Sequence, residues 1–169
     1  PAHVHTVQVI SAQDMLEACL QTLDEIDIFI GVAAVADYRP VTIAEQKIKK
    51  SADTMTLSLV RNPDIIGTIA ARPARPLAVG FAAETNDIQA YGEDKLVRKG
   101  LDMLFANEAV STFGSDNISA TALWRETETT ATLSKLLGPA SKSLVARQML
   151  SLIHQRWLAS DKTRQTARK

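Results

Sequence analysis

The chain has 169 residues with 19 basic and 19 acidic side chains, so no net charge attracts nucleic acid or an anionic membrane, and any anion-binding site must be local. Hydrophobic residues make up 46%, enough for the core of one domain or the larger part of one, but no apolar run approaches the roughly 20 residues of a membrane span. The single cysteine, Cys19, excludes an internal disulfide and is typical of a reducing compartment, so we expect a cytoplasmic location.

The first third of the chain predicts three strands and one helix. The β-branched run His3–Ile10 predicts a strand, and Ser11 is a typical N-cap for the helix that follows it. The nearly continuous apolar run Ile26–Ala36 predicts a strand buried on both faces. The alternation in Thr54–Asn62 predicts a half-buried strand at an edge of the sheet. The apolar face of the helix carries Leu16, Cys19, Leu20 and Leu23.

The middle of the chain continues this alternation. Asn62 or Asp64 opens a short helix, and residues 76–84 predict a central strand. Residues 86–100 predict a polar helix that ends at Gly100, and residues 101–109 predict another apolar strand. Strands that alternate with helices in this way predict a Rossmann-like parallel α/β sheet covered by helices.

The last third follows a different pattern. Residues 121–127 and 129–136 predict an antiparallel hairpin, which extends the fold near the C-terminus, and residues 139–157 predict a closing helix. We expect residues 1–158 to form the folded domain and residues 159–169 to form a polar, disordered tail. The residues of the closing helix expected to face inward are Leu144, Val145, Met149, Leu152 and Ile153.

Polar side chains at the ends of the expected strands mark a candidate ligand site, because ligands of open α/β sheets bind outside the carboxyl ends of the strands. Four loops qualify: one that runs from Ala33 to the lysine run that begins at Lys47, and those at residues 62–64, 81–86 and 106–108. Asp37, Glu84 and Asn107 lie in three of them, but each residue taken singly is typical of an ordinary turn.

Two groups of lysines are candidates for binding an anion. Lys47, Lys49 and Lys50 follow closely on the end of an expected strand, and form either a solvated surface or a cationic clamp for a polyphosphate. Lys95 and Lys99 are four residues apart and share a helix face, where pairing with neighbouring acidic residues is the simpler interpretation.

The other reactive side chains give no further site. His3, His5 and His154 have no cysteine or acidic companion at metal-ligand spacing, so we assign no metal ligand. Cys19 lies on an apolar helix face, which predicts packing. G-x-S-x-G, H-E-x-x-H and P-loop motifs are absent from the sequence. From the residues alone, the leading interpretation is a Rossmann-type nicotinamide oxidoreductase, although the glycine fingerprint of that class is missing.

Six short motifs in a fixed order give a sharper hypothesis. They are AAVADYRP, KIKK, NPDII, VGFAAET, KLVRKGLDMLFAN and FGSDN. Their order and spacing closely resemble the phosphopantothenoylcysteine synthetase domain of the bacterial bifunctional coenzyme A biosynthesis flavoprotein, the phosphopantothenoylcysteine synthetase/decarboxylase. The resemblance covers residues 1–158.

This resemblance implies a CTP-dependent ligase of coenzyme A biosynthesis that requires Mg²⁺. CTP and the carboxylate of 4′-phosphopantothenate give an acyl-cytidylate and pyrophosphate, and the amine of L-cysteine then displaces CMP to form an amide. The resemblance also implies a homodimer, and we expect the hairpin around Trp124–Leu133 to form its interface.

The resemblance further implies which residues bind the nucleotide. Lys47 is the first lysine of the family's K-x-K-K motif, contacts the triphosphate and is the candidate catalytic residue, and Lys49 and Lys50 complete the motif. Residues 63–66 hold the cytidine, and Lys95 and Lys99 face the phosphates. The full set of expected nucleotide-binding residues is Gly31, Val32, Ala33, Asp37, Lys47, Pro63, Asp64, Ile65, Ile66, Phe81, Lys95 and Lys99.

Two parts of the family's enzyme have no counterpart in these 169 residues. One is a glycine-rich segment that precedes the strand expected at residues 1–10 and helps to bind phosphopantothenate. The other is the flavin-dependent decarboxylase domain, which carries FMN and is often fused upstream. Two other functions stay open: a nicotinamide-dependent oxidoreductase and a non-catalytic dimerisation module.

Overall fold

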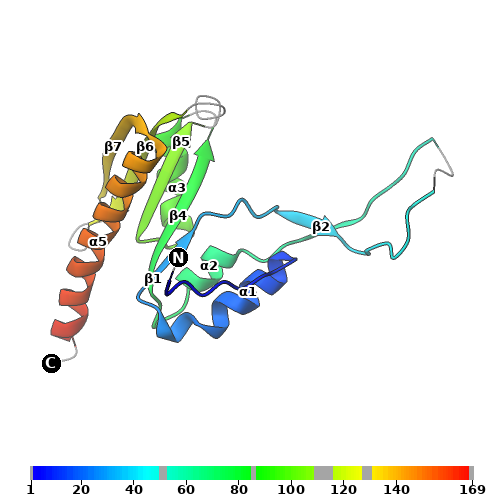
Figure 1. The fold of residues 1–169 in the computed structure, drawn as a ribbon, viewed down its shortest axis with the longest axis horizontal. Coiled ribbons are helices and arrows are strands. Elements are labelled where there is room, and N and C mark those ends of the chain that lie inside the picture. The colour runs from blue at the N-terminus through cyan, green and yellow to red at the C-terminus, as the bar shows by residue number, and fades with distance from the viewer. Residues whose placement is uncertain (1, 50–52, 85–86, 109–115, 127–130, 168–169) are drawn as a thin grey trace.

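One mixed five-stranded sheet organises the computed structural model, which describes residues 2–49, 53–84, 87–108, 116–126 and 131–167 (Figure 1). The first three strands of the sheet are parallel, whereas the last two are antiparallel to their neighbours. The expected Rossmann-like α/β sheet with an antiparallel hairpin near the C-terminus is therefore confirmed. In spatial order the strands are β1 (Ile28–Gly31), β4 (Leu77–Glu84), β5 (Met103–Glu108), β6 (Asn117–Arg125) and β7 (Thr132–Ser141).

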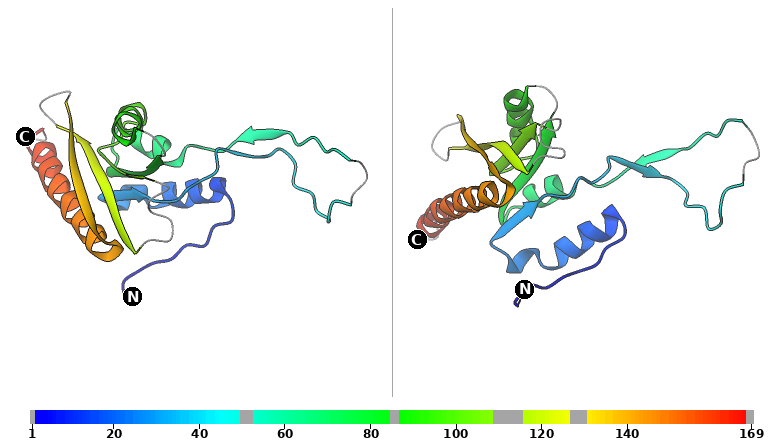
Figure 2. Two further views of the ribbon diagram at one scale, coloured as in Figure 1. Left: turned by 90° about the horizontal axis from the view of Figure 1, so that it is seen from above. Right: turned by 45° about the horizontal axis from the view of Figure 1, so that its top comes forward.

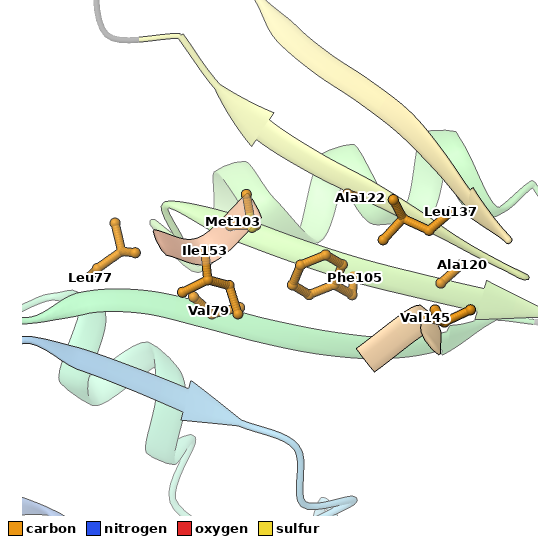
Figure 3. Close-up of a cluster of buried hydrophobic side chains, with 9 residues drawn as sticks. All are labelled: Leu77, Val79, Met103, Phe105, Ala120, Ala122, Leu137, Val145 and Ile153. Atoms are coloured by element: carbon orange, nitrogen blue, oxygen red, sulfur yellow. The ribbon is translucent and has the colours of Figure 1, made fainter. Parts of the chain in front are cut away.

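Helices cover both faces of this sheet, because successive side chains of its central strands point to opposite faces. Phe105 of β5 faces α5 and packs with Val145 and Ile153 of that helix, as Figure 3 shows. Leu104, one residue earlier, faces the opposite side and packs with Leu96 of α3. The helices are α1 (Ala12–Gln21), the short 3₁₀ helix η1 (Leu23–Glu25), α2 (Ile65–Ala70), α3 (Ile88–Arg98) and α5 (Lys142–Ala167).

A second, two-stranded antiparallel ribbon is formed by β2 (Tyr38–Pro40) and β3 (Leu59–Arg61). Figures 1 and 2 show that this ribbon extends away from the five-stranded sheet, with the described residues of the segment 41–58 beyond it. Such a ribbon has no core of its own. Its exposed apolar side chains, with those of the segment, are Tyr38, Val41, Ile43, Ile48, Met55, Leu57, Leu59 and Val60.

The expectations for three strands were wrong. Residues 4–9 form no regular element, so the strand expected at His3–Ile10 is absent. The strand expected at Ile26–Ala36 is limited to β1, which lies at an edge of the sheet, and Val32 beyond it is 62% exposed. The half-buried strand expected at Thr54–Asn62 is the exposed strand β3 of the ribbon. An apolar run does not reveal which strands will lie beside it, and burial on both faces requires such neighbours.

The closing helix α5 differs from the expectation at both ends. It begins at Lys142, because residues 139–141 still belong to β7, and it continues to Ala167, beyond the boundary expected at residue 158. Val145 and Ile153 are buried, and Met149 and Leu152 pack partly against them, as expected. Leu144 is 48% exposed, so its expected inward position was wrong. It lies in the first turn, beside rather than on the stripe of buried residues.

The other helices begin and end where their capping residues predict. The Ser11 hydroxyl accepts a hydrogen bond from the Asp14 amide at 3.1 Å, and the Asp14 carboxylate accepts one from the Ser11 amide at 3.0 Å, which forms a capping box. Helix α3 is followed by Gly100 with φ +64°, a left-handed conformation that favours glycine. Cys19 packs among apolar side chains of α1 and α2, and burial raises the pKa of its thiol.

Gly92 allows helix α3 to approach strand β6 closely. A Cβ atom at residue 92 would lie 2.4 Å from Cδ1 of Leu123, a fully buried side chain of β6. No side chain other than hydrogen fits there without a shift of the helix or of Leu123.

We therefore expect Gly92→Ala to lower the free energy of unfolding by about 1–3 kcal/mol through overpacking, although alanine is the better helix former. Denaturant unfolding of the full-length protein measures this change. Val97→Ala, at an exposed position of the same helix, is the control and should change the stability by less than about 0.5 kcal/mol. Equal stability of Gly92→Ala and the wild type would contradict the described packing.

Candidate functional site

The ends of two helices on the same face of the sheet meet through a pair of opposite charges. Lys99, the C-cap residue of α3, places its Nζ atom 2.8 Å from Oδ1 of Asp64, the N-cap residue of α2. The Lys99 side chain is only 19% exposed, while that of Asp64 is 50% exposed. Two of the expected nucleotide-binding residues, 35 positions apart in the sequence, are thus brought into contact.

The position of Asp64 follows from its capping role. Its Oδ1 atom accepts a hydrogen bond from the Gly67 amide at 3.2 Å, and its carbonyl oxygen accepts one from the Thr68 hydroxyl at 2.7 Å. A Cβ atom at residue 67 would lie 2.6 Å from Oδ2 of Asp64. Glycine at position 67 therefore leaves the space that the carboxylate occupies.

The environment of Asp64 favours its ionised form. Partial burial opposes ionisation, but hydrogen bonds from the Lys99 ammonium and the Gly67 amide, together with the positive charges of Lys99 and Arg98, outweigh it, so the pKa of Asp64 lies below its ordinary value. The contact with Lys99 therefore favours the charged form of the Asp64 carboxyl group.

Residues 63–66, which include the N-cap Asp64 and the first two residues of α2, lie beside the end of β1. Ile65 is buried and packs with Leu23 and Ile69, so its side chain belongs to the core. Ile66 lies over Gly31, the last residue of β1: a Cβ atom there would be 3.0 Å from Cδ1 of Ile66. Pro63 is partly buried. The structure thus brings Gly31 and these residues together.

Hydrogen bonds at the base of the ribbon connect Asp37 to the chain just before residues 63–66. The amide of Asn62 donates to the carbonyl oxygen of Asp37 at 2.8 Å, and the side-chain amide of Asn62 donates to the carbonyl oxygen of Ala36 at 2.8 Å. The Arg39 guanidinium donates to the side-chain oxygen of Asn62 at 3.1 Å. Asp37 is therefore hydrogen-bonded to Asn62, the residue that precedes Pro63, although Asp37 and Pro63 are far apart in the sequence. Val32 and Ala33 are exposed between β1 and this base.

Phe81 lies on the other face of the sheet. Its ring is 5.4 Å from that of Phe105, centroid to centroid, and it packs against the core beneath α5. Lys95 lies one turn before Lys99 on α3 and is partly buried. Of these two expected nucleotide-binding residues, only Lys95 shares the face of the Asp64–Lys99 pair.

Lys47 and Lys49 are exposed residues of the segment beyond the ribbon, which Figure 2 shows to lie away from the helices of the main sheet. The structure thus does not bring the candidate catalytic lysine to the Asp64–Lys99 pair. Lys50 lies outside the described residues. Among the residues that the structure describes, no group of three or more His, Cys, Asp or Glu side chains is arranged to hold a metal ion.

The structure also contains a cavity that sequence reasoning did not predict. It has a volume of about 280 Å³ and lies between Ile88 at the start of α3, Asn107 at the end of β5 and Thr121 of β6. Asn107 was singled out as a strand-end residue, but the contribution of β6 and β7 depends on the antiparallel pairing of those strands. Without the register of β6 on β5, no sequence signal places Thr121 beside Asn107.

The strand order and the charged helix ends define a Rossmann-like α/β domain with its ionic contacts on the α2–α3 face. The chain belongs to the family described as the DNA/pantothenate metabolism flavoprotein C-terminal domain, which matches residues 1–157. No helix in the described part of the chain is both long enough and apolar enough to cross a membrane.

Relatives with curated names support this membership. The chain is 44% identical to the coenzyme A biosynthesis bifunctional protein CoaBC of Vibrio cholerae over 161 residues, which is 92% of this chain and 39% of that protein. It is 39% identical to CoaBC of Escherichia coli K12 over 93% of this chain and 39% of that protein. The chain therefore spans about two fifths of the length of these relatives.

Solved structures give the same answer for the fold. The crystal structure of the C-terminal domain of CoaBC matches 95% of this chain and 69% of that chain, with a TM-score of 0.70 and 34% identity. The DNA/pantothenate metabolism flavoprotein of Streptococcus pneumoniae matches 88% of this chain and 72% of that chain, with a TM-score of 0.65. At 17% identity, the second match concerns the fold alone.

The lowered pKa of Asp64 leads to a prediction about acid stability. A carboxyl group with a lowered pKa in the folded state contributes stability that is fully present above its unfolded pKa, about 3.9, and is lost as the pH falls through its folded pKa. The difference in unfolding free energy between the wild type and Asp64→Asn should therefore be constant above about pH 5 and shrink below about pH 4. Denaturant unfolding at a series of pH values measures it.

Asp94→Asn is the matched control, because Asp94 forms an exposed pair with Arg98 on α3 at 3.3 Å. Exposed pairs of this kind contribute little to stability, so we expect a small difference at every pH. If the difference in unfolding free energy between the wild type and Asp64→Asn is the same at pH 3 and pH 7 within experimental error, the ionised, hydrogen-bonded state of Asp64 is contradicted.

Proposed function

We propose that this chain is the ligase domain of a CTP-dependent enzyme that joins 4′-phosphopantothenate to L-cysteine in coenzyme A biosynthesis. The observation that carries the proposal is the match of residues 1–157 to one family, together with relatives about 40% identical that are named for coenzyme A biosynthesis. The six motifs of the sequence agree with the proposal, and so does the contact of Lys99 with Asp64, one of residues 63–66.

The chemistry explains why such a domain needs cations. A free carboxylate does not acylate an amine, because hydroxide or oxide is a poor leaving group. Attack of the carboxylate oxygen on the α-phosphorus of CTP forms the acyl-cytidylate and breaks the bond to pyrophosphate. The amine of cysteine then attacks the acyl carbon, CMP leaves, and the nitrogen loses a proton. Positive side chains near the departing pyrophosphate stabilise the negative charge that develops there.

We assign the cationic roles to two parts of the chain. Lys95 and Lys99 are held by α3 on the body of the domain and face the phosphates, with Gly31 and residues 63–66 beside the nucleoside. Lys47 belongs to the exposed segment beyond the ribbon. It reaches this site only when the segment folds back or when the segment comes from a second copy of the chain. The second route fits a homodimer, and the hairpin around Trp124–Leu133 stays our predicted interface.

The described residues contain no group of three or more His, Cys, Asp or Glu side chains that could hold Mg²⁺ by themselves. Mg²⁺ commonly binds through substrate phosphates and water rather than through a cage of protein ligands. In this proposal the ion accompanies the triphosphate and neutralises part of its charge when bound. FMN is expected only in the decarboxylase domain that the resemblance implies. The chain covers about two fifths of the length of the CoaBC relatives, so activity is tested on the full-length protein.

Replacing Lys47 tests the chemical step. We expect Lys47→Gln to abolish formation of the acyl-cytidylate without unfolding the protein, because an exposed lysine contributes little to the core. Mass spectrometry of the full-length enzyme with CTP, Mg²⁺ and 4′-phosphopantothenate, with cysteine withheld, detects the intermediate. Lys142→Gln, an exposed residue at the start of α5, is the control and should keep the activity. Full activity of Lys47→Gln would remove Lys47 from the mechanism.

Thermal unfolding tests the choice of nucleotide. A ligand that binds only the folded state stabilises it by about 2.7 kcal/mol when present at 100 times its Kd. We expect CTP with Mg²⁺ to raise the Tm of the full-length protein more than the same concentration of ATP with Mg²⁺. Equal or larger protection by ATP would contradict the proposed specificity for CTP.

A further inference from the structure

Lys99 has an unusual position for a residue expected to bind phosphate. Its side chain is only 19% exposed, and within the described residues its anionic partner is Asp64, at 2.8 Å. The other acidic side chains of α3 have partners of their own: Asp94 pairs with Arg98, and Glu93 accepts a hydrogen bond from Gln89. The Asp64 carboxylate thus lies where it neutralises this ammonium.

From this contact we infer that Asp64 is the counter-ion of Lys99 in the free protein, and that a phosphate group of the ligand takes its place on the ammonium. The inference rests on the proposed function, because it assumes that a polyphosphate binds at Lys99. It assigns to the Asp64 carboxylate a role in tuning the anion affinity of the site, in addition to its role as a helix cap.

The two roles of Asp64 meet at one atom, because Oδ1 accepts the hydrogen bond from the Gly67 amide and also contacts Nζ of Lys99, but they depend on different properties of the side chain. The helix cap needs only a hydrogen-bond acceptor for the Gly67 amide, which the side-chain oxygen of asparagine or serine also supplies. The counter-ion role needs the negative charge. A partly buried ammonium without a counter-charge is unfavourable, so the free protein keeps the pair. Because the Asp64 side chain is half exposed, an incoming anion can approach the Asp64–Lys99 pair from solvent.

The energetic consequence is a competition. A carboxylate about 3 Å from the ammonium repels an incoming phosphate and must give up its own contact with Lys99. Removing its charge while keeping the cap relieves both effects. The free protein loses stability, and the complex with a polyphosphate loses less, so the affinity for the polyphosphate rises.

The test is calorimetric titration of the full-length protein with inorganic tripolyphosphate at a fixed Mg²⁺ concentration. Tripolyphosphate is the probe because it lacks the cytidine that residues 63–66 are expected to contact. We expect Asp64→Asn to bind it about three- to tenfold more tightly than the wild type, the size of coupling common between residues in direct contact. Asp64→Ser, which also preserves the cap, should show a gain in the same direction if the asparagine variant does not fold.

Two controls show whether the effect runs through Lys99. In a Lys99→Gln background, Asp64→Asn should change the affinity by less than about twofold. Asp94→Asn, which removes the same charge from α3 beside Arg98, should likewise change the affinity by less than about twofold. If Asp64 only capped the helix, Asp64→Asn would keep the cap and would not change the affinity for tripolyphosphate.

Three results would overturn the inference. Unchanged or weaker tripolyphosphate binding by Asp64→Asn contradicts the competition, and a gain that persists without Lys99 contradicts the pairing. If the wild type binds CTP but the Asp64 variants gain no affinity for tripolyphosphate, the inference alone fails. If the wild type binds neither CTP nor tripolyphosphate, the proposed function fails and the inference falls with it.

Discussion

The contact between Asp64 and Lys99 depends on the placement of α2 and α3 on one face of a parallel sheet. Helix α2 begins beside Gly31, the end of the short strand β1, and Gly31 pairs with Gly80 in the first half of β4. Helix α3 ends shortly before β5, and Leu104 of β5 pairs with the same Gly80, so the start of α2 and the end of α3 lie close together. The absence of a side chain at Gly67 leaves room for the carboxylate. The candidate site is therefore a consequence of how closely these helices pack, rather than of a separate binding loop.

The lysines of the proposed site divide into a fixed group and a remote group. Lys95 and Lys99 are held by a helix that packs on the core, whereas Lys47 and Lys49 are exposed beyond a two-stranded ribbon. A site divided in this way is complete only after a conformational step or an association of chains. Enzymes that must exclude water from an activated intermediate commonly use such closure, and an acyl-cytidylate is an intermediate of this kind.

Much of the fold was predictable because local rules acted in agreement with the tertiary structure. The serine at position 11, the glycine at position 100 and the apolar strands β4 and β5 gave correct elements. Errors arose where burial depends on distant neighbours. The run Ile26–Ala36 is apolar, but β1 lies at an edge of the sheet. The hydrophobic pattern of a segment does not show how many strands will lie beside it. The burial of the strand expected at Thr54–Asn62 was predicted wrongly for the same reason, because the alternating residues of this segment face solvent instead of a core.

The site was predictable to a smaller extent. Resemblance selected Asp64 and Lys99 as residues near a nucleotide, and the structure brings these two together. Their pairing is a contact between helix ends 35 residues apart, which no spacing rule predicts. Resemblance also could not show that the side chain of Phe81 lies on the face opposite Lys99, or that Lys47 lies on an exposed segment. Those facts depend on the register of β4 and on the length of the ribbon.

The most direct test of the account is a crystal structure of the full-length protein with CTP and Mg²⁺. The account requires phosphate oxygens within hydrogen-bonding distance of Nζ of Lys99 and the nucleoside beside residues 63–66, with Lys47 drawn in from the same or a second chain. A complex in which the phosphates lie elsewhere, while Lys99 keeps its contact with Asp64, would contradict it.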